Sequence, residues 1–271
     1  MEINRFNVME VINKSGLKPD KDYGQNYLLE PEIAKKIIDL LEIEEGESVL
    51  EIGPGLGSLS HFLSLYKNNQ ITMVDIDERM INFLKIIYNE SNISLVLNDI
   101  RKHNVSNYSK IVGNLPYNIT TETVIYLLEN ARKASKMVLM CQSEAFSRFF
   151  DLKGKEYGPA SVLVHLLGDS KRNFVVKPGS FYPIPKCSSL VFTININKNN
   201  DYKHILDAYY FAKKMFLNRR KTIHNNLSNY LNDKDLSLQI LSVVGIAPNK
   251  RPEEISPNEY VELYEKVENH K

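Results

Sequence analysis

The sequence predicts a doubly wound α/β domain followed by a small, all-α C-terminal domain, and three observations support this fold class. Short apolar strands alternate with helical stretches between residues 48 and 196, and the first of these strands runs directly into a glycine-rich loop. A strand that leads into a glycine loop and a helix is the first unit of a nucleotide-binding α/β sheet. After a polar stretch at residues 197–201 the pattern changes to helices alone. We therefore place the domains at residues 1–196 and 197–271.

The elements follow from hydrophobic periodicity and from start signals. Strands are expected at residues 48–52, 70–74, 93–97, 110–113 and 137–140, with a terminal pair at 174–177 and 190–194. Helices are expected from residue 31 and at 120–129, 142–151, 157–167, 202–217, 235–244 and 256–268, after a short helix and lead-in within residues 1–22. Pro31 suits the first position of its helix, and we expect Thr120 or Thr121 to cap the helix that begins there.

The composition is that of a soluble globular protein, since 43% of the residues are hydrophobic and 25% are charged. No run of about 18 apolar residues occurs, so we expect no membrane span, and the N-terminal residues do not have the pattern of a secretory signal. Cys141 and Cys187 show no metal or redox spacing. These features predict a cytoplasmic protein with reduced thiols and no metal site.

The charge is nearly balanced, with 34 basic and 33 acidic residues and a net charge of +1. This balance is a weak footprint for a nucleic-acid binder. A local basic face is still compatible with it, because net charge averages over the whole surface.

The glycine loop after the first strand contains Gly53, Gly55 and Gly57. Dinucleotide binding requires a third glycine where this chain has Ser58. The spacing instead fits S-adenosylmethionine, which has no pyrophosphate to place at a helix N-terminus. Glycines let the backbone approach the methionine and ribose parts of this molecule without intervening side chains.

Polar residues follow four successive strands, namely Glu51, Asp75, Asp99 and Asn114. Ligands of open α/β sheets bind at the carboxyl ends of the strands, so a shared crevice is expected there. Asp75 can accept hydrogen bonds from ribose hydroxyls, and Asp99 can accept from an adenine amino group that Ile100 covers. Asp99 could instead only cap a turn.

Asn114, Leu115, Pro116 and Tyr117 can present a base. An exocyclic amine on adenine or cytosine is a poor nucleophile, because its lone pair is delocalised into the ring. An Asn side-chain oxygen and the backbone carbonyl before Pro116 can accept its N–H groups and draw the nitrogen towards tetrahedral geometry. Pro116 stiffens the loop and biases Leu115 towards an extended conformation. Tyr117 offers a face for stacking, worth about 1–3 kcal/mol per base. The alternative is an ordinary strand-ending turn.

Two further stretches suit contact with RNA. The proline-rich loop at residues 178–186 carries Phe181, predicted to be exposed and to sandwich a flipped base against Tyr117, although the loop could simply connect two strands. A basic cluster in the C-terminal domain suits contact with phosphates, although such clusters are most often solvated surface. The candidate RNA-binding residues are Lys186, Arg219, Arg220 and Lys221.

These motifs together resemble the small-subunit ribosomal RNA adenine N6,N6-dimethyltransferases of the KsgA type. The resemblance runs from residues 24–28 to residues 251–256 and includes the stretches at 51–57, 114–117, 157–158, 181–186 and 218–222. It implies a Rossmann-like, class I S-adenosylmethionine-dependent methyltransferase domain with a helical C-terminal domain. It also implies, as substrate, two adjacent adenines near the 3′ end of 16S rRNA in the small ribosomal subunit.

The resemblance completes the set of candidate site residues. The cofactor-binding candidates are Asn26, Leu28, Glu51, Gly53, Gly55, Asp75, Ile76, Asp99, Ile100 and Asn114. The catalytic candidates are Asn114, Leu115, Pro116, Tyr117 and Phe181. The family's ribose-binding acid is usually Glu, so Asp75 is one methylene shorter. We expect a monomer with no membrane partner and a role in subunit maturation.

Three alternatives stay open. The macrolide-resistance methyltransferases carry out the same chemistry on an adenine of 23S rRNA. A mainly non-catalytic ribosome-assembly factor would keep the site as a relic, and a small-molecule methyltransferase would suit the near-neutral charge. Methylation of isolated small subunits, and not of naked large-subunit RNA, would separate the first alternative from the predicted activity, and salt-insensitive substrate affinity would favour the third.

Overall fold

The computed structural model describes residues 7–20, 23–116, 119–197 and 201–270. The chain divides into two compact units. The first contains the chain up to Ala145 together with Ser170–Ile196, and the second contains Phe146–Asp169 and the chain from Asn197 onwards. The predicted boundary at 196/197 coincides with one of these division points. The inclusion of residues 146–169 in the second unit was not predicted.

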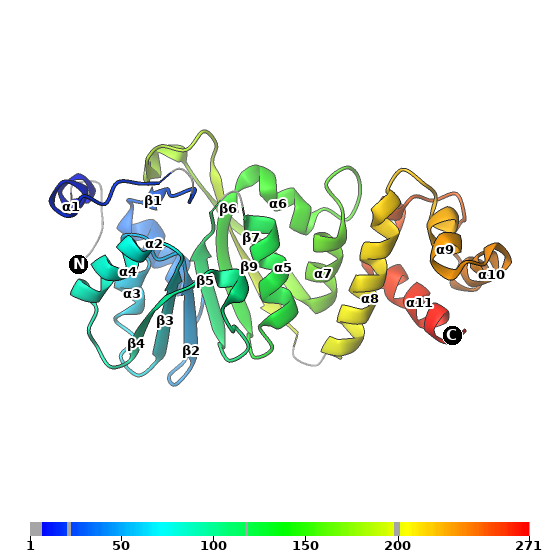
Figure 1. The fold of residues 1–271 in the computed structure, drawn as a ribbon, viewed down its shortest axis with the longest axis horizontal. Coiled ribbons are helices and arrows are strands. Elements are labelled where there is room, and N and C mark those ends of the chain that lie inside the picture. Colours follow the sequence, from blue (N-terminus) through cyan, green and yellow to red (C-terminus); the bar gives the residue numbers. More distant parts are fainter. Residues whose placement is uncertain (1–6, 21–22, 117–118, 198–200, 271) are drawn as a thin grey trace. The chain divides into compact units, whose positions relative to one another are not determined.

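The first unit is built on a sheet with strand order β4-β3-β2-β5-β6-β9-β7 (Figure 1). Its strands are β2 (Ser48–Ile52), β3 (Gln70–Asp75), β4 (Ile93–Leu97), β5 (Lys110–Asn114), β6 (Lys136–Gln142), β7 (Gly168–Val176) and β9 (Ser189–Ile196). The strands β2 to β6 pair in parallel, and β9 runs antiparallel to β6. This arrangement confirms the predicted α/β fold and every predicted strand.

Three helices of the first unit lie in predicted segments, namely within residues 1–22, from residue 31 and at 120–129, whereas the helix at residues 78–87 was not predicted. The helical elements of this unit are α1 (Val8–Ser15), α2 (Pro31–Asp39), α3 (Ser60–Leu63), α4 (Glu78–Ile87), the 3-10 turn η1 (Ile100–Lys102) and α5 (Thr120–Asn130). Pro31 occupies the first turn of α2 as expected. The predicted threonine cap of α5 is wrong, because Ile119 stands at the cap position and the Thr120 hydroxyl donates to the Pro116 carbonyl at 2.9 Å.

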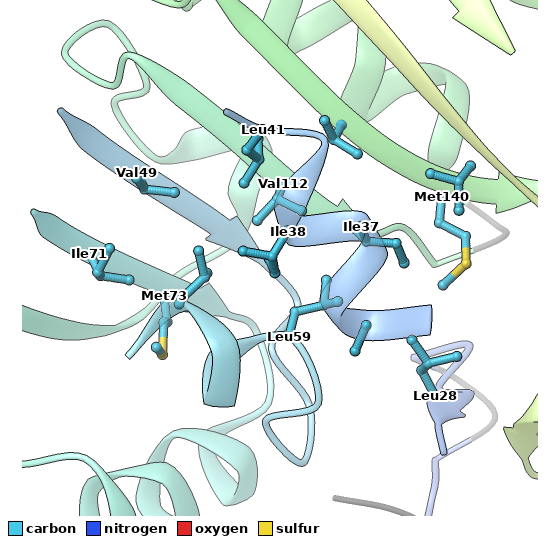
Figure 2. Close-up of a cluster of buried hydrophobic side chains, with 14 of the residues drawn as sticks. Leu28, Ile37, Ile38, Leu41, Val49, Leu59, Ile71, Met73, Val112 and Met140 are labelled. Carbon is cyan, nitrogen blue, oxygen red and sulfur yellow. The ribbon is translucent and has the colours of Figure 1, made fainter. Parts of the chain in front are cut away.

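A hydrophobic cluster packs α2 and Leu28 against the sheet. Figure 2 shows its side chains meeting between α2, the strands and Leu28. Leu28 is 2% exposed, and it belongs to β1 (Tyr27–Leu28), a short strand that the sequence did not predict. β1 pairs antiparallel with β8 (Phe181–Tyr182) in a separate two-stranded ribbon. The cluster therefore holds β1, which lies between α1 and α2, next to the sheet.

The second unit is helical, as predicted for the C-terminal domain. Its elements are the end of α6 (Ser143–Phe150), α7 (Pro159–Leu167), α8 (Tyr202–Met215), η3 (Phe216–Asn218), α9 (Ile223–Leu231), α10 (Lys234–Val244), η4 (Pro252–Glu254) and α11 (Pro257–Glu268). Asp201, Thr222, Asp233 and Ser256 cap four of these helices through their side chains. Such caps are worth about 1 kcal/mol each, and the unit's core includes the fully buried Tyr157, Tyr209 and Tyr260.

Candidate active site

The strand order reverses between β2 and β5, because the chain runs outwards through β3 and β4 and then returns to the other side of β2. Crevices at such switch points, beyond the carboxyl ends of the strands, are where open α/β sheets bind ligands. Ile52 pairs with both Val74 and Gly113, so β2, β3 and β5 end at the same level. Gly53 and Asn114 consequently lie side by side, as the sequence predicted.

Two adjoining cavities, both open to solvent, lie at this switch point. The first is lined by the predicted residues Asn26, Leu28, Glu51, Gly53, Gly55, Asp75, Ile76, Asn114, Leu115 and Pro116. The second adds Asp99 and Ile100 and shares Gly53, Asp75, Ile76 and Pro116 with the first.

The glycine loop depends on backbone conformations that other residues rarely adopt. Gly53, Gly55 and Gly57 have φ values of 63°, 55° and 93°, in the left-handed region that costs L-residues about 1–2 kcal/mol. A Cβ on Gly55 would also stand 3.1 Å from the ring of Tyr27. At Gly53 and Gly55 the loop therefore presents backbone to the first cavity, which Pro54, Leu56 and Ser58 also line.

Asp75 is a nearly buried carboxylate at the end of β3, with 8% exposure. Its Oδ1 accepts from the Asp77 N–H at 2.9 Å, and its Oδ2 accepts from the Gly55 N–H at 3.3 Å. Burial raises the pKa of Asp75 to about 6, in spite of the hydrogen bonds to Asp77 and Gly55 that lower it. Each oxygen keeps a lone pair for a further donor, as hydrogen bonds from ribose hydroxyls require.

Glu51 is buried to 1% exposure, although it also lines the first cavity. The Ser60 hydroxyl donates to its Oε2 at 2.7 Å. Burial raises the pKa of Glu51 to about 8, and the nearby Asp75 contributes in the same direction. Glu51 is therefore mostly neutral at pH 7 and acts as a hydrogen-bonding group, not as a charge.

The second cavity is lined by the acidic side chain of Asp99 and by apolar side chains that include Ile76 and Ile100. Asp99 accepts from the Arg101 N–H and guanidinium, and the hydrogen bond and charge of Arg101 hold the pKa of Asp99 below its usual value. Ile76 is 50% exposed and lines both cavities. This combination suits a planar, amine-bearing ring between apolar side chains.

Asn114 is oriented by a hydrogen bond from its own amide. Its Nδ2 donates to the Asn26 backbone carbonyl at 3.0 Å. Because the donor end of the amide is engaged there, Oδ1 is the end available to accept hydrogen bonds. Leu115 is anchored by its N–H, which donates to the Met140 carbonyl at 2.9 Å.

The prediction of an exposed stacking ring at Phe181 is wrong. Phe181 is 1% exposed and belongs to the same hydrophobic cluster as Leu28, its partner in the β1–β8 ribbon. A strand alternates its side chains between two faces, and here the apolar ring takes the face towards the core. Phe181 therefore anchors the ribbon, and we do not assign it to base stacking. Tyr117, the other predicted stacking residue, lies outside the described residues.

The four predicted RNA-binding side chains differ from one another in their exposure to solvent. Lys186, Arg220 and Lys221 are exposed. Arg219 is only partly exposed, because its Nη1 and Nη2 donate to the Lys155 and Gly154 carbonyls at 2.6 Å each. Its guanidinium thus holds a loop of the second unit.

Sequence reasoning missed several residues around the crevice. Tyr23 and Gln25 line the first cavity, and Ser58 donates to the Leu28 carbonyl at 2.6 Å. Asp77 caps α4 by accepting from the Arg79 N–H. An acidic residue immediately before a helical stretch is a cap signal, so Asp77 was detectable, whereas the contacts of Gln25 and Ser58 join distant segments and carry no local signal.

The fold and the crevice define a class I S-adenosylmethionine-dependent methyltransferase. A glycine loop that exposes backbone fits the amino-acid part of the cofactor, the Asp75 carboxylate fits its ribose, and the second cavity fits its adenine. Within the described residues, no group of three or more His, Cys, Asp or Glu side chains could hold a metal ion, and no helix combines the length and apolar character needed to cross a membrane.

The chain belongs to the ribosomal RNA adenine dimethylase family, whose model matches residues 16–269. It is 34% identical to the ribosomal RNA small subunit methyltransferase A of Malacoplasma penetrans, over 97% of this chain and 96% of that protein. It is also 34% identical to the protein of the same name from Fusobacterium nucleatum, over 91% of this chain and 96% of that protein. The chain is therefore a ribosomal RNA adenine dimethyltransferase that uses S-adenosylmethionine.

Solved structures agree with this fold. A dimethyladenosine transferase from Plasmodium falciparum superposes with a TM-score of 0.75 at 22% identity, over 89% of this chain and 97% of that one. The 23S rRNA methyltransferase ErmE superposes with a TM-score of 0.66 at 21% identity, over 89% of this chain and 99% of that one. At these identities the similarity is one of fold alone.

Proposed function

We propose that this enzyme dimethylates N6 of two adjacent adenines near the 3′ end of 16S rRNA, in the small ribosomal subunit. The small-subunit methyltransferase name of relatives at 34% identity over most of both chains supports this substrate. On this proposal the enzyme acts as a monomer in the cytoplasm, where it contributes to subunit maturation.

The observation that carries the chemistry is the orientation of Asn114. With Nδ2 donating to the Asn26 carbonyl, Oδ1 accepts one N–H of the target amine and the Leu115 carbonyl accepts the other. The nitrogen lone pair is then directed out of the ring plane towards the first cavity. Tyr117 stacks on the base.

Bound S-adenosylmethionine supplies a methyl group on a sulfonium, which leaves as a neutral thioether. The methylated amine is briefly a strong acid, so no strong base is needed to remove its proton. Rate enhancement comes from positioning, which can supply about 7–11 kcal/mol, and from fixed dipoles at the amine. Glu51 and Asp75 line the first cavity and support the cofactor there.

The test is mass spectrometry of ribosomal RNA after incubation with isotope-labelled S-adenosylmethionine. Unmethylated small subunits should gain two labelled methyl groups on each of two neighbouring adenines near the 3′ end of their RNA. Labelling of large-subunit RNA in place of the small subunit would support the 23S alternative. Binding to small subunits without any labelling would support the non-catalytic alternative.

A second assay addresses a small-molecule substrate. Affinity for the RNA substrate should fall steeply with salt, because contacts with phosphates release counterions. Substrate affinity that does not change between 50 and 200 mM salt would contradict an RNA substrate.

A further inference from the structure

The rotamer of Asn114 depends on a carbonyl that belongs to a different part of the chain. Asn26 precedes β1, 88 residues before Asn114 in sequence, and its carbonyl accepts the Asn114 Nδ2–H at 3.0 Å. If this carbonyl moved away, the amide could rotate by 180° and present N–H donors to the target amine. The N–H groups of the rotated Asn114 amide would then face the N–H groups of the target amine, and no hydrogen bond could form between them. The position of residues 25–27 therefore decides whether the Asn114 amide can accept from that amine.

Gln25, the residue before Asn26, is held by both ends of its side-chain amide. Its Oε1 accepts from the Tyr27 hydroxyl at 2.9 Å and from the Asp20 N–H at 2.8 Å. Its Nε2 donates to Asp77 Oδ2 at 2.8 Å. The side chain thus joins the segment before β1 to the start of α4.

Asp77 is the fixed end of this connection. It is 3% exposed, caps α4 through the Arg79 N–H and forms an ion pair with the Arg79 guanidinium at 2.7 Å. Burial alone would raise the pKa of Asp77, but the hydrogen bonds from Arg79 and Gln25 outweigh it and lower the pKa. Asp77 is therefore an ionised acceptor at neutral pH, and a hydrogen bond to an ionised group is about twice as strong as a neutral one.

Tyr27, the residue after Asn26, is fixed on the other side. Its side chain is 5% exposed, its ring lies against Gly55, and its hydroxyl reaches Gln25 and the Met80 sulfur. The carbonyl of Asn26 is thus bracketed by two residues whose side chains share one hydrogen bond.

We propose that Gln25 and Asp77 are positioning residues for methyl transfer, acting through the Asn26 carbonyl to hold Asn114 with Oδ1 towards the target amine. This inference rests on the proposed role of Asn114. The hydrogen bonds of Gln25 and Asp77 also connect the two ends of the crevice, because the Asp77 backbone N–H donates to the Asp75 carboxylate at 2.9 Å, on the ribose side.

The test is a double-mutant cycle on the single-turnover rate with saturating S-adenosylmethionine and small subunits. Gln25→Ala should lower this rate about tenfold, since misplacement of a reacting group by about 1 Å can cost about 100-fold. In an Asn114→Ala background the same change should alter the residual rate less than twofold. Equal effects of Gln25→Ala in the two backgrounds would overturn the inference.

Two further variants separate positioning from general damage. Asp77→Asn keeps an acceptor for Gln25 and a good helix cap, so it should retain the rate within about threefold, whereas Asp77→Ala should lose about as much as Gln25→Ala. Gln70→Ala, an exposed glutamine at the start of β3, is the matched control and should leave the rate unchanged. A loss in Asp77→Asn as large as in Asp77→Ala would contradict the role of the hydrogen bond.

A spectroscopic measurement applies even if Asn114→Ala has no measurable residual rate. The side-chain amide of Asn114, followed by NMR in protein labelled with ¹⁵N-asparagine, should show slow hydrogen exchange. Gln25→Ala should accelerate that exchange by about tenfold or more, and an unchanged exchange rate would overturn the inference. If Asn114→Ala itself transferred methyl groups at the wild-type rate, the proposed mechanism would fail, whatever the result for Gln25.

Discussion

The two ends of the crevice are built in different ways. The cofactor end is formed by the glycine loop and by carboxyl groups at the ends of adjacent strands, so the pairing of β2, β3 and β4 fixes its parts. At the acceptor end, Asn114 is the last residue of β5, and its side-chain amide takes its orientation from the Asn26 carbonyl. The sheet thus fixes the groups around the cofactor, whereas at the acceptor end it fixes the backbone and a hydrogen bond from a distant segment sets the direction of the Asn114 amide.

The two ends also differ in their response to pH. Glu51 and Asp75 are buried carboxyl groups whose pKa values are raised to about 8 and about 6. The acceptor end uses an amide and a backbone carbonyl, which do not ionise. Changes at the cofactor end should therefore affect binding and pH dependence, and changes at the acceptor end should affect the rate.

The largest effect is expected from a substitution that disrupts the acceptor end of the crevice. Asn114→Ala should lower the rate of methyl transfer about 100-fold or more, as loss of one preorganised dipole does in other active sites. The dissociation constant for S-adenosylmethionine, measured by calorimetry, should change less than about threefold. A variant that transfers methyl groups at the wild-type rate would contradict the assignment.

A smaller effect is expected from a substitution that disrupts the cofactor end of the crevice. Gly55→Ala adds a Cβ 3.1 Å from Tyr27 at a φ of 55°, so the loop must shift, and we expect about tenfold weaker cofactor binding. Gly46→Ala is the matched control, because Gly46 has a φ of 83° but no heavy atom within 4 Å of the added Cβ. Calorimetry should show wild-type binding for Gly46→Ala. Equal weakening by both variants would point to general strain.

The pH dependence of cofactor binding tests whether the cofactor end, unlike the acceptor end, depends on an ionisable group. Asp75 accepts hydrogen bonds best when ionised, and its pKa is raised to about 6. Cofactor affinity should therefore increase several-fold from pH 5 to pH 7, and Asp75→Asn should bind more weakly at pH 7 with a flatter profile. Calorimetric titrations at several pH values measure this change. If the affinity of Asp75→Asn increased by the same factor from pH 5 to pH 7, the pH dependence would belong to another group.

The smallest expected effect concerns stability without cofactor. The folded-state pKa of Glu51 is raised to about 8, so the folded state binds more protons than the unfolded chain between about pH 4 and pH 8. Its contribution is present below the unfolded pKa and is lost as the pH rises through 8. Between pH 5 and pH 8 the wild-type Tm should therefore fall about 5 °C more than that of Glu51→Gln. Parallel falls in differential scanning calorimetry would contradict a raised pKa.

Much of the cofactor end could be predicted from the sequence, because its signals are local. The strand at residues 48–52, its glycine loop and the acid that ends the next strand are contiguous patterns, and parallel pairing then brings them together. Asn114 was predicted in the same way, from its place after a strand.

The remaining contacts could not be predicted, because they join segments far apart in sequence. The β1–β8 ribbon has two residues in each strand, too few for a periodic signal, yet it turns the Phe181 ring into the core. Gln25 shows no local pattern that indicates Asp77 as its partner. The inclusion of residues 146–169 in the helical unit is likewise a property of tertiary packing.

The most direct measurement is a rapid-quench series on wild type, Gly55→Ala and Asn114→Ala, in which S-adenosylmethionine is raised to saturation against fixed small subunits. If the ends have separate roles, the rate of Gly55→Ala rises to within about threefold of wild type, whereas that of Asn114→Ala levels off about 100-fold below it. Recovery of Asn114→Ala at high cofactor concentration would show that residue 114 serves the donor, and would contradict the account.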